Sequence, residues 1–326
     1  TKYSDFLEYY THRDRKKTAL IEDFVINILQ EKPLWSSAEI AFGEYTTSFD
    51  GTERTAEDYC DCHEDFCNNL AKYLKKEQSY VNLINPDYGK IFISAFTNLR
   101  KGFREEPSAS IDDVMSAFSG GITYNFLSFN YTNTLDLLHK QAKESPTIGK
   151  RLHKNAYHQN AVGKLVHVHG YVDRDMVLGV NDVSQIKNPQ LFENQDEEYL
   201  NQIIKRQTNQ ANEQYTDDIA HDLLRTSDVI YIYGMAIGET DAIWWERICD
   251  VLNQNINSIL IVHAFDAPPD TLIRRKYRVF ERNRKFEILQ YAQIDDEVKK
   301  RLAQKIFVTG ENIFSEFSNL AKEHDT

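Results

Sequence analysis

Two polar side chains stand where predicted strands end, and together they could break a glycosidic bond. Asn130 follows the β-branched and aromatic run Ile122 to Phe129, and His169 ends the apolar run that starts at Lys164. In open α/β sheets ligands bind outside the carboxyl ends of the strands, so both residues are expected at one crevice. An imidazole acts as a general base near neutral pH, and an amide orients a water molecule or a ribose hydroxyl.

Simpler roles for these residues stay open. Asn130 could cap a turn, because asparagine side chains commonly bond to nearby backbone groups. His167 and His169 alternate along the predicted strand and are therefore expected on one face. That spacing would suit half of a metal site, but no third ligand is evident in the neighbouring sequence, and we predict no metal here.

Two further segments run from an apolar strand into glycine. They are Tyr233 to Asp241, with Gly234 and Gly238, and Val177 to Asp182, with Gly179 and Asn181. A turn between a strand and a helix points free N–H groups at a bound phosphate. Glu239 and Asp241 would compete with such an anion, because acidic side chains also stabilise a helix N-terminus.

The other candidate metal ligands cluster on one predicted helix. Cys60, His63 and Cys67 fall at i, i+3 and i+7 and so share a face, with Cys62 beside them. Such soft ligands could hold zinc. Zinc ligands usually come from two separate elements, however, and Cys249 is the only other cysteine in the sequence. Ordinary reduced thiols are therefore the prediction, with zinc as the alternative.

The first 119 residues are predicted to form a mainly helical portion, because apolar side chains recur at three- and four-residue intervals. The expected helices are Asp5 to Tyr10, Thr18 to Gln30, Ala56 to Lys76, Tyr88 to Arg104 and Ile111 to Phe118. Gly43 to Thr52 is rich in Gly, Thr and Ser and is expected to be a loop.

Residues 120–326 alternate short apolar strands with helices. The expected strands are Ile122 to Phe129, Lys164 to His169, Met176 to Val180, Asp228 to Tyr233 and Ile259 to His263. The expected helices are Asn133 to Lys143, Glu197 to Arg225, Asp241 to Leu252 and Pro268 to Val279. This alternation is typical of an α/β domain whose mostly parallel sheet is covered on both faces. We treat residues 1–326 as one such domain.

Composition narrows the class of protein. The chain has 326 residues, enough to bury a core, and no apolar run approaches the roughly 18 residues of a membrane span. Its four cysteines form no disulfide framework, which favours a cytoplasmic location. A net charge of −12 argues against nucleic acid binding through a broad basic surface. The basic run at 274–285 is predicted to be a solvated helix face, with a phosphate or partner contact as the alternative.

Several sequence blocks in a fixed order resemble a known family. They are Ser128 to Thr132, His167 to Gly170, Leu178 to Asp182 and Tyr233 through Trp245, together with the opening Thr1 to Leu7 and Leu34-Trp35. This pattern spans nearly the whole chain. It is similar to the bacteriophage abortive-infection AbiH family, within the wider sirtuin-like group.

The resemblance implies a sirtuin-like, Rossmann-type fold that binds NAD, in a defence protein that cleaves NAD to nicotinamide and ADP-ribose. Asn130 and His169 become its catalytic residues, and Thr132 and Asp136 would flank the ribose. The residues implied to contact NAD are Phe129, Tyr131, Thr132, Gly170, Gly179, Asn181, Gly234, Gly238 and Asp241. NAD or a related nucleotide is the implied partner. A phage-encoded trigger and a homo-oligomer would also fit this family, whereas a membrane or nucleic acid partner is not expected.

Two features depart from the family pattern. Family members carry a strand and a Gly-Asn-Gly-Phe-Asp type loop just before the segment that matches Thr1 to Leu7, so both are expected upstream of residue 1. Ala236 stands where the family usually has serine, which removes a hydroxyl from the ligand contacts. Both departures favour an alternative, in which the chain senses NAD or ADP-ribose without cleaving it. A toxin of another class, such as a nuclease, is the second alternative.

Overall fold

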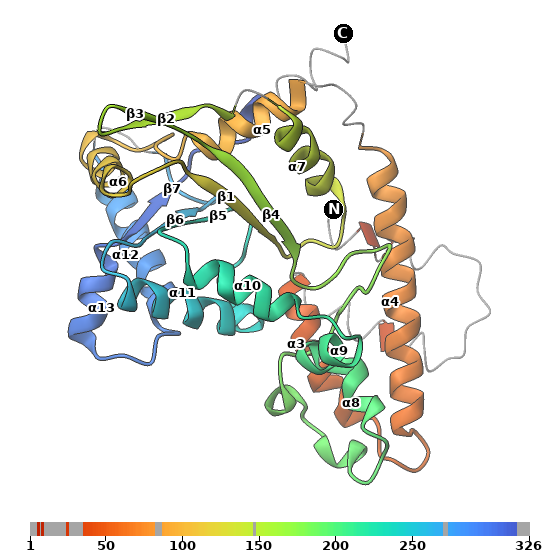
Figure 1. Cartoon of the computed structure of the whole chain (residues 1–326). Helices are drawn as coiled ribbons and strands as arrows, with labels where there is room; N and C mark the ends of the chain where they lie inside the picture. Colours follow the sequence, from red (N-terminus) through yellow and green to blue (C-terminus); the bar gives the residue numbers. More distant parts are fainter. Residues whose placement is uncertain are drawn as a thin grey trace.

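Short parallel strands lie at the centre of the molecule, with helices packed around them (Figure 1). The structure is a computed structural model. It describes residues 5–6, 8–9, 24–25, 35–81, 87–145, 148–269 and 273–317. The predicted mixed α/β class, with parallel strands flanked by helices, is confirmed.

The parallel strands form two small sheets. In the first, β1 (Thr123–Ser128) pairs with β4 (Ala161–His167), and Ser128 lies opposite His167. The second has the order β5 (Val229–Ile232), β6 (Ile259–His263) and β7 (Ile306–Thr309). Four of the expected strands are thus present within a few residues of their predicted bounds.

An antiparallel hairpin and β7 were not predicted from the sequence. The hairpin joins β2 (Lys150–His153) to β3 (Ala156–Gln159). Its two turn residues, Lys154 and Asn155, have positive φ angles of 46° and 64°. A two-residue turn of this kind is usually indicated by Asn-Gly or Asp-Gly, and Lys-Asn lacks that signal.

The longer helices carry most of the chain's regular structure. They are α3 (Trp35–Tyr45), α4 (Ala56–Ser79), α5 (Asp87–Thr97), α6 (Glu105–Ala117), α7 (Thr134–Glu144), α10 (Thr216–Arg225), α11 (Ala242–Gln254), α12 (Arg275–Leu289) and α13 (Asp296–Ala303), with the shorter α8 (Glu198–Ile203) and α9 (Lys205–Ala211). A capping box starts α4, because the Thr55 hydroxyl accepts from the Asp58 N–H while the Asp58 carboxylate accepts from the Thr55 N–H.

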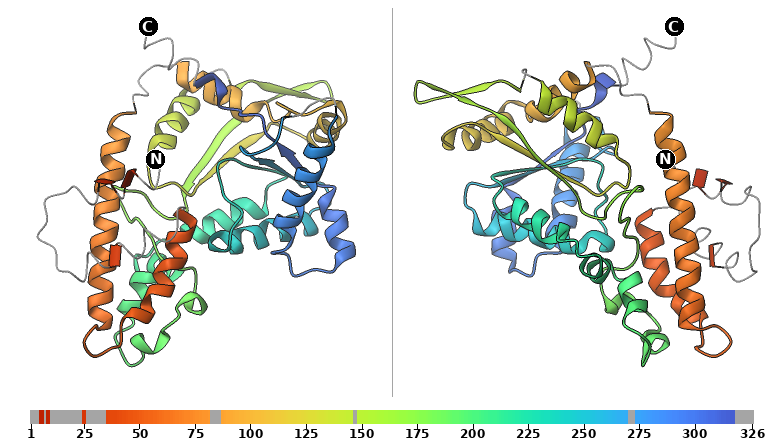
Figure 2. Two further views of the ribbon diagram at one scale, coloured as in Figure 1. Left: turned by 180° about the vertical axis from the view of Figure 1, so that it is seen from behind. Right: turned by 45° about the vertical axis from the view of Figure 1, so that its right-hand side comes forward.

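Helices cover both faces of the strands. On one face α10, α11, α12 and α13 build a core around Trp245, Leu252 and Leu260. On the other face α6 packs on the second sheet through Ile111, and α5 packs beside α7 on the first sheet through Phe92. Figure 2 shows these layers from behind and in an oblique view. Because both faces are covered, the strands are apolar almost throughout, as parallel strands usually are.

A second core lies beside the sheets, where α4 runs past α3 and α8 (Figures 1 and 2). It is rich in aromatic rings that meet edge to face. Phe42 contacts Phe66 at a centroid distance of 5.2 Å, and Phe24 contacts Tyr59 at 5.6 Å. This core joins Phe42 of α3 and Ile204, just before α9, to Tyr131 and Val172, which follow β1 and β4, and this matters for the site described below.

The loop expected at Gly43 to Thr52 is wrong in its first half. Helix α3 continues to Tyr45, and a 3-10 turn follows at Thr46–Ser48. Gly43 lies inside this helix, at a position with no room for a larger residue. A Cβ there would lie 2.1 Å from the Gln185 carbonyl oxygen. A close tertiary contact therefore explains this glycine, where the sequence suggested a loop.

The strand expected at Met176 to Val180 is also wrong. Within this segment only Val180 forms a β-bridge, with Ile204. The other backbone groups bond to turns and side chains, since the Val177 N–H donates to His169 O and the Val177 carbonyl accepts from the Tyr131 hydroxyl. These bonds join the segment to residues that follow β4 and β1, but the segment does not add a strand to the first sheet.

Some helix boundaries differ from the predicted ones. The helix expected at Tyr88 to Arg104 ends at Thr97, and α6 begins at Glu105 rather than Ile111. Pro107 lies in the first turn of α6, where a helix needs no backbone N–H donor. Helix α12 begins at Arg275 instead of Pro268 and continues past Val279. Most of the helix expected at Thr18 to Gln30 lies outside the described residues.

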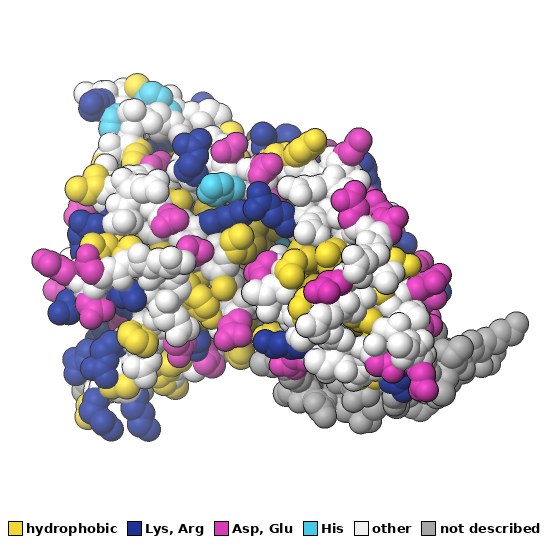
Figure 3. Space-filling model, turned by 90° about the horizontal axis from the view of Figure 1, so that it is seen from below, with side chains coloured by type: hydrophobic (Ala, Val, Ile, Leu, Met, Phe, Trp, Pro, Cys, Tyr) yellow, Lys and Arg dark blue, Asp and Glu magenta, His cyan; other side chains and the backbone are white. Residues whose placement is uncertain are grey.

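The basic run predicted near residue 280 lies on α12. Arg275, Arg278 and Arg282 are exposed, whereas Arg284 pairs with Asp266 at 2.7 Å. Seen from below, side chains of both charges are interspersed over the surface, and basic ones gather at one corner (Figure 3). The arrangement agrees with the predicted solvated helix face; the alternative partner contact stays a prediction.

Candidate functional site

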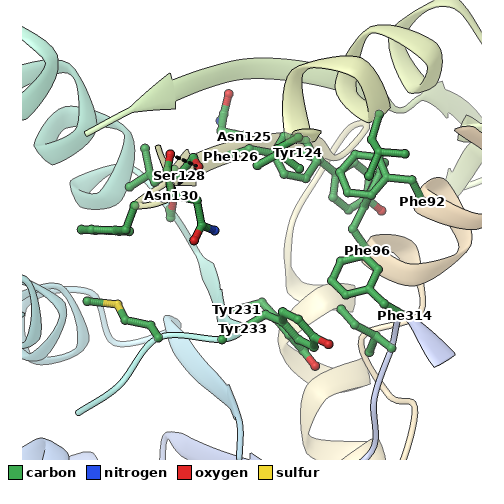
Figure 4. Close-up of a pocket in the computed structure, with 18 of the residues that line it drawn as sticks. Phe92, Phe96, Tyr124, Asn125, Phe126, Ser128, Asn130, Tyr231, Tyr233 and Phe314 are labelled. Atoms are coloured by element: carbon green, nitrogen blue, oxygen red, sulfur yellow. Dashed lines mark hydrogen bonds between the residues drawn. The ribbon is translucent and has the colours of Figure 1, made fainter. Parts of the chain in front are cut away.

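A cavity of about 1440 Å³ lies between the two parallel sheets. Residues along β1 form one wall, and residues along β5 form another. Aromatic side chains from α5 and from the segment that follows β7 close one side (Figure 4). Within the described part of the chain β1 and β5 are both edge strands, so their free edges border this cavity. Phe92, Phe96 and Phe314 line its apolar end.

Asn130 and His169 lie at the other end of the cavity, just past two paired strands. The register sets Ser128 opposite His167, and the Val168 N–H donates to Ser128 O at 2.9 Å, so the chains still run side by side where the strands end. Both Asn130 and His169 line the cavity, as the strand-end argument predicts. Figure 4 shows the Asn130 amide directed into it.

The turn after β1 is held by Ser128 rather than by the Asn130 side chain. The Asn130 N–H donates to the Ser128 hydroxyl at 3.3 Å, and that hydroxyl is 3.4 Å from the Asn130 carbonyl oxygen. Among the described residues the Asn130 amide has no hydrogen-bond partner. The simpler interpretation of Asn130 as a turn cap is therefore wrong, and its side chain is available to a ligand.

Gly170 makes the turn that follows His169. Its φ is +64°, and a Cβ would lie 1.8 Å from the Asp175 carbonyl oxygen. Only glycine combines the left-handed conformation with so close a backbone approach. The turn brings Val177 back beside His169, whose carbonyl oxygen accepts from the Val177 N–H at 2.9 Å. Gly170 is therefore required for the turn that brings these two residues together.

The two histidines of this strand do not share one environment, contrary to the expectation from alternation. Strand β4 ends at His167, so the alternating pattern stops before His169. The His167 ring is 2.8 Å from the Asp136 carboxylate on α7 and 3.2 Å from the Asn130 carbonyl oxygen. Burial disfavours the charged form of His167, but these two partners outweigh it and raise its pKa.

His169 is buried, with only 8% of its surface exposed, and its Nδ1 has no hydrogen-bond partner among the described residues. Its ring contacts the Phe129 ring edge to face at 5.5 Å. Burial, and secondarily the Lys205 ammonium, lower the pKa of His169 well below its usual value. The imidazole is therefore neutral at neutral pH, and its buried Nδ1 is left without a partner among the described residues.

A cluster of buried charges stands behind His169. Lys205 at the start of α9 pairs with Glu39 of α3 at 2.7 Å, and their side chains are only 6% and 14% exposed. Asp241, just before α11, is close to both. Burial raises the pKa of Asp241 to about 6, against the opposing effect of Lys205 and with a further rise from Glu39. Glu39 and Asp241 line the cavity.

The family model described as Bacteriophage abortive infection AbiH matches residues 1–263. The chain belongs to the AbiH family. The description of this family links the protein to bacteriophage abortive infection. No curated protein and no solved structure matches the chain.

The AbiH sequence blocks do not all reach the cavity. Of the residues predicted for the site, those on its wall are Phe129, Asn130, Tyr131, Thr132, His169, Gly234 and Asp241. Gly234 has a φ of +69°, and a Cβ added there would meet no described atom within 4 Å, so a ligand can approach its backbone. Four other residues predicted for the site do not line the cavity, namely Gly170, Gly179, Asn181 and Gly238.

Two of these four residues have clear structural roles in this AbiH protein. The Asn181 amide donates to the Thr240 carbonyl at 2.6 Å and so fixes the segment that carries Asp241. At Gly179 a Cβ would lie 2.1 Å from the Ile203 carbonyl oxygen, close to the start of α9. Both residues thereby position Asp241 or Lys205, and their predicted contact with NAD stays a prediction.

Sequence reasoning missed Glu39 and Lys205 altogether. They lie far apart in the chain, on helices whose polar residues follow no motif, and only the packing of α3 and α9 against the strand ends brings them together. The family resemblance implies only that Asp136 flanks the ribose, whereas its carboxylate lies 2.8 Å from the His167 ring. No spacing rule identifies such partners.

The cysteine-rich face of α4 is part of the second core. His63 Nε2 is 3.0 Å from the Leu178 carbonyl oxygen, and burial lowers the pKa of His63 to about 4. Burial also raises the pKa values of Cys60, Cys62 and Cys67 to about 12, so the thiols stay protonated. The described residues include no group of three or more His, Cys, Asp or Glu side chains arranged to hold a metal ion.

None of the helices that the structure describes has the length and apolar character needed to cross a bilayer.

Proposed function

We propose that this AbiH protein binds NAD in the cavity and hydrolyses its nicotinamide–ribose bond, in the cytoplasm of the phage-infected cell. The observation that carries the proposal is the pairing of Asn130 and His169 on the cavity wall, past the ends of two hydrogen-bonded parallel strands. Ligands of α/β proteins bind at this edge of the sheet. The proposal includes the sirtuin-like, Rossmann-type grouping of the fold.

The size of the cavity supports a dinucleotide. Pockets for drug-sized ligands are on the order of 300–1,000 Å³, and this cavity holds about 1440 Å³. Gly234 leaves backbone open at the end of β5, where a ligand phosphate could approach. Phe129, Tyr131 and Thr132 would surround the nicotinamide ribose, since they follow β1 directly.

The proposed reaction needs one base and one orienting group. The bond between ribose C1′ and the nicotinamide nitrogen breaks, its electron pair neutralises the pyridinium, and nicotinamide leaves through an oxocarbenium-like state. A water oxygen then bonds to C1′, and its proton passes to His169, giving ADP-ribose. Asn130 holds the water or a ribose hydroxyl. His169 suits this role because it is neutral and its Nδ1 is free of any described partner.

The test is NAD consumption by the purified full chain, followed by chromatography of nicotinamide and ADP-ribose. We expect His169→Ala and Asn130→Ala to lower the rate by about 100-fold or more. His221→Ala, on the exposed face of α10, is the matched control and should retain full activity. Because the pKa of His169 is low, the rate should rise with pH well below 6.5 and be level above it.

Binding without cleavage is the second candidate, and burial of His169 favours it, since a strongly lowered pKa makes a weaker base. Calorimetric binding of NAD without turnover, in wild type and in His169→Ala alike, would select this candidate. Lack of both binding and turnover would contradict the NAD proposal. RNA and DNA that stay intact in the same incubations would dismiss a nuclease. A phage-encoded trigger and a homo-oligomer belong to the proposal through the family resemblance alone.

A further inference from the structure

The charges at the polar end of the cavity do not balance. Glu39 and Asp241 line the cavity, and both are partly buried, while Lys205 lies behind them and is almost fully buried. The one ammonium pairs with Glu39 at 2.7 Å. When both carboxylates are ionised, the three groups carry one net negative charge, and that charge faces the cavity.

The other charged groups on the described wall cannot balance this excess. Arg151 and Asp228 also line the cavity. Arg151 interacts with Tyr124 and donates to the Met115 carbonyl, and Asp228 precedes β5, so both lie at the ends of β1 and β5 remote from Asn130. A buried carboxylate without a partner is costly, and either a proton or a bound cation relieves that cost.

We propose that Glu39 and Asp241 make the polar end of the cavity selective for a positively charged ring, the pyridinium of an N-ribosylated nicotinamide, over its neutral counterpart. A second observation points to a ligand at this place. The His169 ring is more than nine-tenths buried, lines the same end of the cavity, and has an Nδ1 without a partner among the described residues. The identity of the ring rests on the proposed function, whereas the charge preference rests on the carboxylates.

Proton and cation compete for Asp241. Burial raises its pKa to about 6, and the titratable groups around it are Lys205, Glu39, Tyr131 and Tyr291. Burial also raises the pKa of Glu39, although its pair with Lys205 opposes this rise. The two tyrosines stay protonated at neutral pH, because burial raises their pKa values. A bound cation favours the ionised carboxylate and expels the proton. Cation affinity should therefore increase as the pH rises through about 6.

The experiment compares NAD⁺ with NADH, which differ at this end mainly in the charge of the nicotinamide ring. Calorimetry from pH 5 to pH 8 is run on full chains that all carry Asn130→Ala, which slows turnover of NAD⁺. This parent, called wild type here because its carboxylates are unchanged, is compared with Glu39→Gln, Asp241→Asn and the exposed control Glu193→Gln. We expect wild type and the control to bind NAD⁺ roughly tenfold more tightly than NADH at pH 8. At pH 5 the preference should be small.

Either substitution leaves the cluster neutral, so both variants should lose the preference, and Asp241→Asn should also lose the change in affinity near pH 6. Equal affinities for the two dinucleotides in wild type at pH 8 would overturn the inference. So would an unchanged preference in both variants. If a variant does not fold, the wild-type pH series still tests the inference, because the preference for NAD⁺ over NADH must increase from pH 5 to pH 8.

A second arm separates this inference from the proposed function. If neither dinucleotide binds, the NAD proposal fails, and the probes become 1-methylnicotinamide, which is cationic, and nicotinamide, which is neutral. NMR titration of Asp241 then shows whether the cation alone lowers its pKa. A lowered pKa with the cation and not with nicotinamide supports the charge preference. No change with either probe overturns it.

Discussion

His167 and His169 lie two residues apart yet have opposite shifts in pKa. His167 is held by a carboxylate and a backbone carbonyl, which raise its pKa despite burial. His169 has no described acceptor on Nδ1, so burial and the nearby Lys205 lower its pKa. At the residue scale the local partners and burial, and not the sequence spacing, decide the direction in which the pKa of each ring shifts.

Replacing Asp136 with Asn should lower the pKa of His167, because burial is then opposed mainly by the Asn130 carbonyl. A raised folded-state pKa stabilises the protein fully below the unfolded value near 6.5, and this stability is lost as the pH rises through the folded-state value. We expect Asp136→Asn to cost about 1 kcal/mol of unfolding free energy at pH 5.5, since the carboxylate is partly exposed. The cost should shrink by pH 8.5.

Chemical denaturation at the two pH values measures this difference, and NMR follows the His167 titration directly. Asp112→Asn removes an exposed pair with Arg100 and is the control without a histidine partner. An unchanged pKa of His167 in Asp136→Asn would refute the assignment.

Gly170→Ala tests the turn that positions His169. The substitution combines a φ of +64° with a Cβ placed 1.8 Å from a backbone oxygen, so we expect a loss of about 3 kcal/mol or more. Gly120→Ala has a φ of +90° but open space around the Cβ, and it should lose only about 1 kcal/mol. Thermal or denaturant unfolding compares the two. Equal losses would mean that the close backbone contact does not exist in solution.

At the scale of elements, the pair of Glu39 and Lys205 joins α3 to α9 behind the strand ends. These helices come from distant parts of the chain, and the second core packs α3 and the residues just before α9 near the segments that follow β1 and β4. A buried ion pair adds little net stability, but removing one partner leaves an unpaired buried charge. The pair is therefore a structural requirement of the polar end of the cavity.

Lys205→Met should lower the free energy of unfolding by about 3 kcal/mol at pH 7, because Glu39 is left unpaired. The double variant Lys205→Met with Glu39→Leu should recover most of that loss. Lys90→Met, which breaks an exposed pair with Asp87, should change stability by less than about 1 kcal/mol. Denaturant titration gives all three values. A double variant no more stable than Lys205→Met would argue against a direct pair.

At the scale of the whole molecule, the two parallel sheets differ in how well their strands are protected. Strand β6 lies between β5 and β7, and Leu260 and Ile261 are fully buried. Strands β1 and β5 each border the cavity with one edge. Backbone groups on such an edge reach water without the fold opening, whereas those of a central strand do not.

Amide hydrogen exchange should therefore be slowest in β6 and faster in β1 and β5. Addition of NAD should slow exchange at Phe129 to Thr132 if it binds where we propose, and should leave α13 unchanged. Mass spectrometry of peptic fragments resolves these segments. Protection of β1 equal to that of β6 in the free protein would show that the cavity is not open to solvent.

Local patterns in the sequence determined the elements that need no distant partner. The periodicity of Ala56 to Lys76 predicts α4, and the apolar runs predict β1, β5 and β6. Such elements can be predicted because the apolar pattern of a helix face or a buried strand lies within one continuous segment. The same patterns predict that Asn130 and His169 meet, since parallel strands end at one edge.

Only the tertiary structure decided the electrostatics of the candidate site. The helix position at residue 43 requires glycine because the Gln185 backbone packs against it. The partners of Lys205 and His167 are set by helices that pack near the strand ends. These contacts join segments far apart in the chain, and their energies depend on burial that no local pattern encodes. The sequence therefore locates the crevice, while the fold determines which of its groups are charged.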